Sequence, residues 1–160
     1  METILNNDSV KRVKKIISKF DSNINIVVLD NSTRTAKEAA FSLNCDVGAI
    51  IKSLVIKNKE SFLICLVPGD KRCSFKKMKT ILNKTDIRMA NAQEVKENTG
   101  FSIGGVSPVG HSKKLDILID KSLKRFENIY AAAGHPNCIF KINYNELIKI
   151  TNGSVKDIIE

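Results

Sequence analysis

The stretch AIIKSLVIKNKESFLICLV, residues 49–67, decides the fold of this chain. Two apolar runs flank the polar segment KNKE, and such runs on either side of a short polar turn predict an antiparallel β-hairpin. Side chains alternate between the two faces of a strand, so Lys52 shares a face with Leu54 and Ile56. A lysine in apolar company loses hydration. Lys52 therefore either snorkels at a strand end or serves a site.

Helices and strands follow one another irregularly around the hairpin. Helical spacing and capping residues predict helices over residues 9–20, 35–43, 74–82 and 91–99, and a closing helix over 145–151. Apolar runs predict strands over residues 23–30, 114–120, 127–134 and 137–142. Because regular helical crossovers are missing, we expect a mixed α/β (α+β) fold. Its mostly antiparallel sheet should form a partly open barrel with flanking helices.

The length and composition indicate one folded domain over residues 1–160. The chain is long enough to bury a real core, and a second independent domain is not expected. Hydrophobic residues make up 42% and charged residues 27%, which is typical of a globular protein rather than a disordered one.

The net charge of +9 favours an anionic partner, and nucleic acid is the leading candidate. Basic residues cluster at residues 11–15, 71–79 and 113–114. A footprint for nucleic acid needs such clusters as well as a total charge. The alternative reading is that these side chains are merely solvated.

The four cysteines indicate neither a zinc site nor a disulfide framework, because they have no C-x-x-C spacing and only two histidines could join them. Cys65 and Cys138 lie in apolar runs, where reduced cysteine acts as a small hydrophobe. The sequence has no apolar signal segment and no run of about 18 apolar residues. We therefore expect a cytoplasmic protein with no membrane segment.

Two glycine-containing loops could carry chemistry. GGVSPVGH, residues 104–111, can turn backbone N–H groups toward a phosphate or carbonyl oxygen, although an ordinary turn would explain the pattern equally well. In AAAGHPN, residues 131–137, the alanines leave room for a substrate or for a helix packed above. His135 could exchange protons near neutral pH or be a solvated loop residue.

Taken in order, these segments resemble the YbaK and prolyl-tRNA-synthetase-associated domains, which edit mischarged tRNA. TRTAKEAAFSLNCDVGAIIKSLVI, residues 33–56, is similar to the opening signature of that family, a Thr-Ala-x-x-Ala-Ala helix leading to a strand with a characteristic lysine, here Lys52. Gly104 and Pro108 match its G-x-x-x-P loop, and Gly134 falls in its late glycine-containing turn. The resemblance covers residues 33–142. It implies an N-terminal helix and strand over 1–30 and an editing core over 31–160.

The resemblance implies a freestanding aminoacyl-tRNA deacylase that acts in trans on the ester of mischarged tRNA. Aminoacyl-tRNA would be its substrate and prolyl-tRNA synthetase a candidate partner, and the amino acid stays open among Cys, Ala, Ser and Pro. Neither a Ser-His-Asp nor a Cys-His set stands out in the sequence. The resemblance implies that a ribose hydroxyl of the tRNA assists the attack by water, without a cofactor or a metal.

The resemblance also assigns the candidate site, with Lys52 beside the terminal adenosine and the loop around the aminoacyl ester. The candidate catalytic residues are Lys52, Gly104, Gly105 and Pro108. The candidate substrate-binding residues are Thr35, Ser53, Val106, Ser107, Gly110, His111, Gly134 and His135. Two alternatives remain: a non-catalytic tRNA- or RNA-binding module on the same scaffold, and a hydrolase of another small acyl ester.

Overall fold

The computed structural model describes residues 2–30 and 35–160, so Thr33 and Arg34 of the opening signature lie outside the described residues. The helices are α1 (Glu2–Leu5), α2 (Asp8–Phe20), α3 (Ala36–Leu43), α4 (Phe75–Leu82), α5 (Ala92–Thr99) and α6 (Tyr144–Thr151), with short 3-10 turns η1 (Val47–Ala49) and η2 (Lys121–Arg125). The strands are β1 (Ile26–Val28), β2 (Ile51–Asn58), β3 (Ser61–Pro68), β4 (Ile87–Met89), β5 (Asp116–Asp120), β6 (Ile129–Ala132), β7 (Cys138–Ile142) and β8 (Ser154–Lys156). None of the helices in the described ranges has the length and apolarity needed to cross a membrane.

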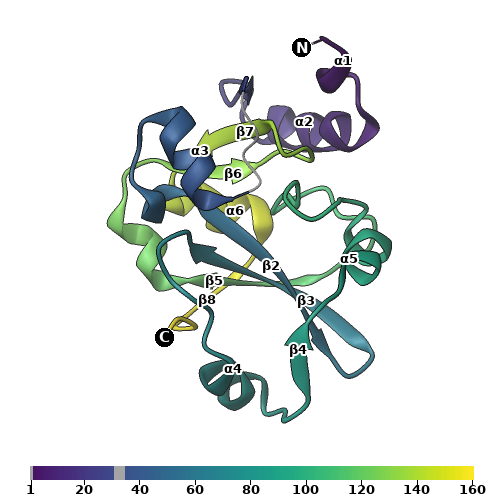
Figure 1. Ribbon diagram of the computed structural model, residues 1–160, viewed down its shortest axis with the longest axis vertical. Helices are drawn as coiled ribbons and strands as arrows, with labels where there is room; N and C mark the ends of the chain where they lie inside the picture. The colour runs from purple at the N-terminus through teal and green to yellow at the C-terminus, as the bar shows by residue number, and fades with distance from the viewer. Residues whose placement is uncertain (1, 31–34) are drawn as a thin grey trace.

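The strands form two sheets that meet at one corner (Figure 1). One sheet has the order β4-β2-β3-β5-β8 and the other the order β1-β7-β6. An isolated parallel bridge between Ile50 and Tyr130 joins the start of β2 to β6. The expected mixed α/β architecture is confirmed, and its strands lie in two sheets that this bridge joins.

The predicted hairpin is confirmed. Strands β2 and β3 pair over their whole length, from Ile51 opposite Pro68 to Asn58 opposite Ser61. The strands expected over residues 127–134 and 137–142 are also present as β6 and β7, which are antiparallel neighbours with Ala132 opposite Ile139. Four of the six strand pairings in the described residues are antiparallel, so antiparallel pairing predominates overall, as expected.

Two features of the larger sheet were not predicted. Strand β5 pairs in parallel with β3 and with β8, and β8 follows the helix that the sequence indicated as the closing element. Strand β5 is buried on both faces, so its side chains do not alternate in exposure. All three residues of β8 are exposed, so this strand carries no apolar signal.

Strand β2 contributes side chains to separate hydrophobic cores on its two faces. Ile51 belongs to the main core, which α2 and α6 also enter, whereas Ile56 packs on the other face against Met78 of α4. Just before the strand, Ile50 packs under α3 against Ala40. Because successive side chains of β2 point to opposite faces, the strand is packed from both sides.

The predicted helix starts are confirmed by their caps. The side chains of Thr35, Ser74 and Asn91 each accept a hydrogen bond from the backbone N–H three residues later, at 3.1, 3.2 and 2.9 Å. At Asn91 the reciprocal bond from its own N–H to the Glu94 carboxylate completes a capping box. These bonds satisfy N–H groups that a helix start leaves unpaired.

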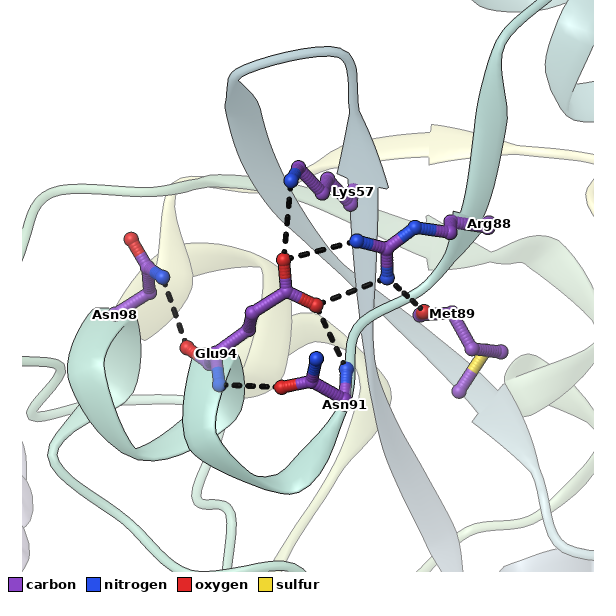
Figure 2. Close-up of polar contacts among 6 residues, drawn as sticks. All are labelled: Lys57, Arg88, Met89, Asn91, Glu94 and Asn98. Carbon is purple, nitrogen blue, oxygen red and sulfur yellow. Dashed lines mark hydrogen bonds and ion pairs between the residues drawn. The ribbon is translucent and has the colours of Figure 1, made fainter.

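Glu94 at the start of α5 also joins two strands of the larger sheet (Figure 2). Its carboxylate lies 3.1 Å from the Lys57 ammonium of β2 and accepts two bonds, of 2.9 and 3.0 Å, from the Arg88 guanidinium of β4. These partners lower the pKa of Glu94 to about 2, with the Arg88 hydrogen bonds as the main cause and the Asn91 N–H next. Glu94 therefore fastens α5 to β2 and β4.

We expect the stability contribution of Glu94 to disappear in acid. Because folding lowers its pKa from 4.5 to about 2, the contribution is complete above pH 4.5 and is lost as the pH falls toward 2. Thermal unfolding of Glu94→Gln should begin well below wild type at pH 7, and the gap should shrink below pH 4.5. Glu127→Gln, a change at an exposed glutamate, is the matched control and should follow wild type. A gap that stays constant down to pH 2 would contradict this prediction.

Candidate active site

A cleft of about 430 Å³ opens where the two sheets separate beyond the Ile50–Tyr130 bridge. Its walls come from the start of α3 at Thr35, the first half of β2, residues 103–106, and strand β6. Ala132 of β6 lines the cleft, whereas Ala131 and Ala133 are buried in the main core. The run of alanines therefore leaves room on the cleft side and packs tightly on the other.

The floor of the cleft is an open strand edge. Strand β4 pairs only with Ile56–Asn58 of β2, and the Val55 carbonyl accepts a bond of 2.9 Å from the Ala90 N–H on that side. Backbone groups alternate in direction along a strand, so Ser53 turns its N–H and C=O to the same side, where β4 no longer runs. The Ser53 hydroxyl oxygen is buried and has no hydrogen-bond partner among the described residues. Ser53 thus offers unpaired polar groups within the cleft lining.

Lys52 is half-buried at the same cleft. Its ammonium donates a hydrogen bond to the backbone carbonyl of Lys71. Burial lowers the pKa of Lys52, and the nearby Arg72 acts in the same direction, whereas Asp70 opposes the shift. Lys52 therefore carries a partly desolvated charge with a backbone acceptor at its tip.

The backbone that holds Lys52 is itself supported by the C-terminal segment. The Ser74 N–H donates to the Ile158 carbonyl at 2.7 Å, and the Glu160 N–H donates to the Arg72 carbonyl at 2.9 Å. The Ile158 N–H in turn donates to the fully buried carboxylate of Asp120 at 2.9 Å. Strand β5 thereby positions residues 71–74 by way of the C-terminal segment, which lies between them.

The loop of residues 104–108 is held by close backbone packing. Gly104 has a φ of +94°, a conformation that glycine adopts without strain, and it lines the cleft. Gly105 lies against the turn after β6, because a Cβ at this position would come within 3.0 Å of the backbone N and Cα of His135. The loop therefore presents Gly104 and Val106 to the cleft and Gly105 to the neighbouring turn.

Ser107 and His111 stabilise the loop from inside. The buried Ser107 hydroxyl accepts a bond of 3.2 Å from the Val109 N–H, and its carbonyl accepts one of 2.7 Å from the His111 Nε2. Burial lowers the pKa of His111, and the nearby Arg12 guanidinium adds to the shift. His111 also contacts Phe101 edge to face, with 6.0 Å between ring centroids. His111 thus donates a hydrogen bond to the loop backbone, and its burial favours the uncharged imidazole.

Gly134 and His135 lie in the turn that packs against the loop of residues 104–108. A Cβ at Gly134 would come within 2.8 Å of the Ser9 backbone at the start of α2, and its φ is +94°. The His135 Nδ1 accepts a bond of 3.0 Å from the Asn137 N–H. The turn therefore packs between α2 and the loop of residues 104–108.

The predicted site residues accordingly fall into three places. One group lines the cleft: Thr35, Lys52, Ser53, Gly104 and Val106. Pro108, Gly110 and His111 border a separate hollow of about 490 Å³. Gly105, Ser107, Gly134 and His135 pack inside or beneath the loop.

Sequence reasoning missed several residues that line the cleft, among them Lys37, Ile103 and Tyr130. Lys37 lies inside the predicted α3 signature, directly after Thr35 and Ala36, so its position was within reach. Tyr130 lies two residues before Ala132 in β6, and the strand period places both on one face. Ile103 lies in an irregular loop and carries no such signal.

The fold and cleft define a small mixed α/β domain with a ligand-sized hollow between two sheets. The chain belongs to the aminoacyl-tRNA editing domain family, whose model matches residues 30–150. The resemblance to YbaK and prolyl-tRNA-synthetase-associated domains is thereby confirmed.

The relatives range from small proteins to segments of synthetases. A proline–tRNA ligase of Thermosipho africanus is 38% identical over 97 residues, which cover 61% of this chain and 17% of the ligase. This chain thus spans about a fifth or less of the length of the ligases it matches. The protein YwhH of Bacillus subtilis is 28% identical over 92% of this chain and 94% of its own length.

Solved structures show the same architecture. "Crystal structure of a putative trans-editing enzyme for prolyl tRNA synthetase" describes a chain that superposes with a TM-score of 0.89 at 36% identity. The superposition covers 96% of this chain and 98% of the other. The chain therefore shares its fold with that protein over nearly its whole length.

We expect Gly105→Ala to destabilise the protein. The new methyl group would press on the His135 backbone, which cannot rotate away as a side chain could, so the free energy of unfolding should fall by about 1–3 kcal/mol. Urea unfolding measures the change. Ser102→Ala, at an exposed position of the same loop, is the control and should stay within about 0.5 kcal/mol of wild type. Equal stability of both variants would show that the loop and turn can separate freely.

Proposed function

We propose that the chain hydrolyses the ester bond of mischarged aminoacyl-tRNA in the cleft beside Lys52. The observation that carries this proposal is the meeting of the Lys52 strand and the Gly104 loop at one hollow, although 51 residues separate them in the sequence. Its volume of about 430 Å³ lies within the usual range for pockets that take small molecules. The terminal adenosine and its aminoacyl group are ligands of that class.

In this proposal Lys52 binds the sugar and phosphate of the terminal adenosine. Its ammonium is already partly desolvated, so an incoming anion would regain electrostatic energy that the free protein lacks. The Lys71 carbonyl occupies only one of its three donors. The remaining N–H groups are available to phosphate and ribose oxygens.

The aminoacyl ester would lie between the open edge of β2 and the glycine loop. The Ser53 hydroxyl has no partner in the part of the chain that the structure describes, and by strand alternation its backbone groups lie on the edge of β2 beyond β4. Gly104 on the opposite wall allows the loop backbone to come close to the ester. Donors fixed in advance around an ester carbonyl stabilise the charge that develops on its oxygen.

The chemistry of the cleft favours substrate assistance. No aspartate, glutamate, histidine or cysteine is among the described residues that line it. The described lining therefore offers no carboxylate, imidazole or thiolate base, and in this proposal Lys52 binds the substrate while a ribose hydroxyl of the substrate assists the water. The protein would contribute orientation and electrostatic stabilisation.

The edited amino acid would be small. Apolar side chains such as Ile51, Val106 and Ile139 line the cleft, and an adenosine bound there would take up much of its volume. A relative from Enterococcus faecalis, 25% identical over 125 residues, is named "Putative Cys-tRNA(Pro)/Cys-tRNA(Cys) deacylase EbsC". We therefore propose Cys, Ala, Ser or Pro as the amino acid, with action in trans in the cytoplasm beside prolyl-tRNA synthetase.

Lys52→Ala tests the proposed site. Loss of the ammonium removes a positioning contact, so single-turnover hydrolysis of a mischarged tRNA should fall about a hundredfold or more. Lys52→Arg should keep the charge without restoring the rate, because a planar guanidinium cannot take the place of a compact ammonium. Circular dichroism checks the fold, and Lys141→Ala at an exposed position of β7 is the control. A folded Lys52→Ala protein with the wild-type rate would show that Lys52 is not part of the active site.

A panel of mischarged tRNAs, with each amino acid also presented as aminoacyl-adenosine, tests the function as a whole. The expected result is hydrolysis of one or two small aminoacyl esters on tRNA, faster than spontaneous loss. Binding without turnover would favour the RNA-binding module. If aminoacyl-adenosine is hydrolysed as fast as the aminoacyl-tRNA, the alternative of a hydrolase of another small acyl ester would be favoured.

We expect binding of tRNA to weaken steeply with salt. Helix α2 exposes Lys11, Lys14 and Lys15, and α4 exposes Lys76 and Lys79. Each phosphate that such a lysine neutralises releases counterions, so affinity should fall more than tenfold between about 50 and 200 mM salt. Fluorescence anisotropy with labelled tRNA measures the slope. An affinity that does not change over this range would contradict a basic tRNA surface.

A further inference from the structure

The lining of the cleft changes from buried to exposed toward its opening. Ile51 and Ile139, which form part of the inner wall, are 5% and 4% exposed. Thr35, Lys37 and Ile103 line the same cleft and are exposed, so these three residues lie at its opening. Ile103 is 59% exposed, and it is the one large apolar side chain at the opening among the described residues.

Ile103 belongs to a turn that is held at both ends. The Gly105 N–H donates a hydrogen bond of 2.9 Å to the Ser102 carbonyl, and the φ of +94° at Gly104 is typical of the third residue of a type II turn. Before the turn, Phe101 is fully buried in the main core. After it, Gly105 packs on the backbone of the turn that follows β6. The turn therefore fixes Ile103 at the opening of the cleft without burying it.

The opening thus combines polar groups from the start of α3 with one apolar group from the turn. Thr35 and Lys37 are the polar residues, and Ile103 is the apolar one. A ligand that covers Ile103 gains free energy, because both apolar surfaces leave water. A nucleoside has the same division of character, with polar oxygens on its sugar and flat apolar faces on its base.

We propose that Ile103 contacts a face of the adenine base of the terminal adenosine and so positions the nucleoside at the opening of the cleft. This inference rests on the proposed function, which places the ester between β2 and Gly104 and the sugar at Lys52. The body of the tRNA stays outside the cleft, so the nucleoside lies nearer the opening than the amino acid does. Its base is the broad apolar part that reaches Ile103.

The amino acid matches Ile103 less well than the base does. The proposed amino acids are small, and the inner wall at Val106 and Ile139 already offers buried apolar surface to them. A small side chain is covered by this wall alone, whereas a purine is broad enough to extend to the opening. Ile103 therefore contributes affinity for the nucleoside rather than a choice among amino acids.

Two small probes separate the base from the rest of the nucleotide. They are adenosine 5′-monophosphate (AMP) and ribose 5-phosphate, which has no base, and NMR titration measures the affinity of each. Ile103→Ala should weaken the binding of AMP about tenfold and leave that of ribose 5-phosphate unchanged. Ile103→Leu should bind AMP nearly as well as wild type, because leucine keeps the apolar volume.

Two further variants serve as comparisons in the same titrations. Lys52→Ala should weaken both probes, because the proposed contact of Lys52 is with the sugar and phosphate. Val27→Ala changes an exposed valine of β1 that does not line the cleft, and it should weaken neither. Circular dichroism checks that each variant is folded.

Turnover tests the same contact in the whole substrate. Ile103→Ala should raise KM about tenfold for aminoacyl-tRNA and for 3′-aminoacyl-adenosine alike, with kcat nearly unchanged. A contact with the base is made equally in the ground state and the transition state, so its loss affects binding alone. The order in which the variant hydrolyses different amino acids should remain that of wild type.

Three results would overturn this role of Ile103. The first is a wild-type protein that does not bind AMP. The second is an Ile103→Ala protein whose losses are equal for AMP and ribose 5-phosphate, or absent for both. The third is a changed order of amino acids, which would place Ile103 against the amino acid. If wild type hydrolyses no mischarged tRNA, the proposed function fails, and the comparison of AMP with ribose 5-phosphate still decides whether Ile103 contacts a base.

Discussion

The unequal pairing of the two edges of β2 is the constraint on which the rest of the structure depends. One edge pairs with β3 along the whole strand, whereas the other pairs with β4 only at Ile56–Asn58. Both faces are packed against hydrophobic clusters, so the strand cannot shift to cover its free edge. A rigid strand with a free half-edge is a suitable floor for a binding cleft, because its backbone groups are held in place before a ligand arrives.

The wall opposite this edge depends on contacts that only glycine permits. Gly105 lies on the backbone of the turn at His135, and Gly134 in that turn lies on the backbone of Ser9. Helix α2, the turn and the loop of residues 104–108 therefore form consecutive layers. Backbone contacts, rather than adaptable side chains, therefore fix the position of the loop. A site that orients an ester needs such a fixed position.

Local sequence patterns predicted the parts of the fold that depend on residues close together in the sequence. The hairpin, the capped helices at Thr35, Ser74 and Asn91 and the β6–β7 pair all follow from polar turns, caps and apolar runs. The parallel pairing of β5 did not, because it joins segments about 50 residues apart through contacts that no local pattern encodes. Strand β8 is short and exposed, so nothing in its composition marks a strand.

Only part of the candidate site was predictable from the sequence, because its residues come together through the tertiary fold. The motif residues Lys52 and Gly104 do line one cleft, and their meeting there is a property of the tertiary fold. His111 and His135 suggested chemistry by residue type, yet each makes a hydrogen bond with the backbone of its own loop. The buried Ser53 hydroxyl, which has no hydrogen-bond partner among the described residues, was not visible in the sequence, because its surroundings are set by the tertiary fold.

The charge around Lys52 determines what kind of ligand the cleft can accept. Asp70 is near enough to act on the pKa of Lys52, but its carboxylate is bound by the Arg125 guanidinium through bonds of 2.9 and 3.2 Å. Arg72 adds a further positive charge that acts against the charged form of Lys52. Lys52 thus lies near Arg72 and near a carboxylate that is already paired with Arg125, so its positive charge is only partly balanced. A neutral ligand would leave that charge uncompensated, whereas a phosphate group would balance it, and a nucleotide is therefore a better match than a small uncharged ester.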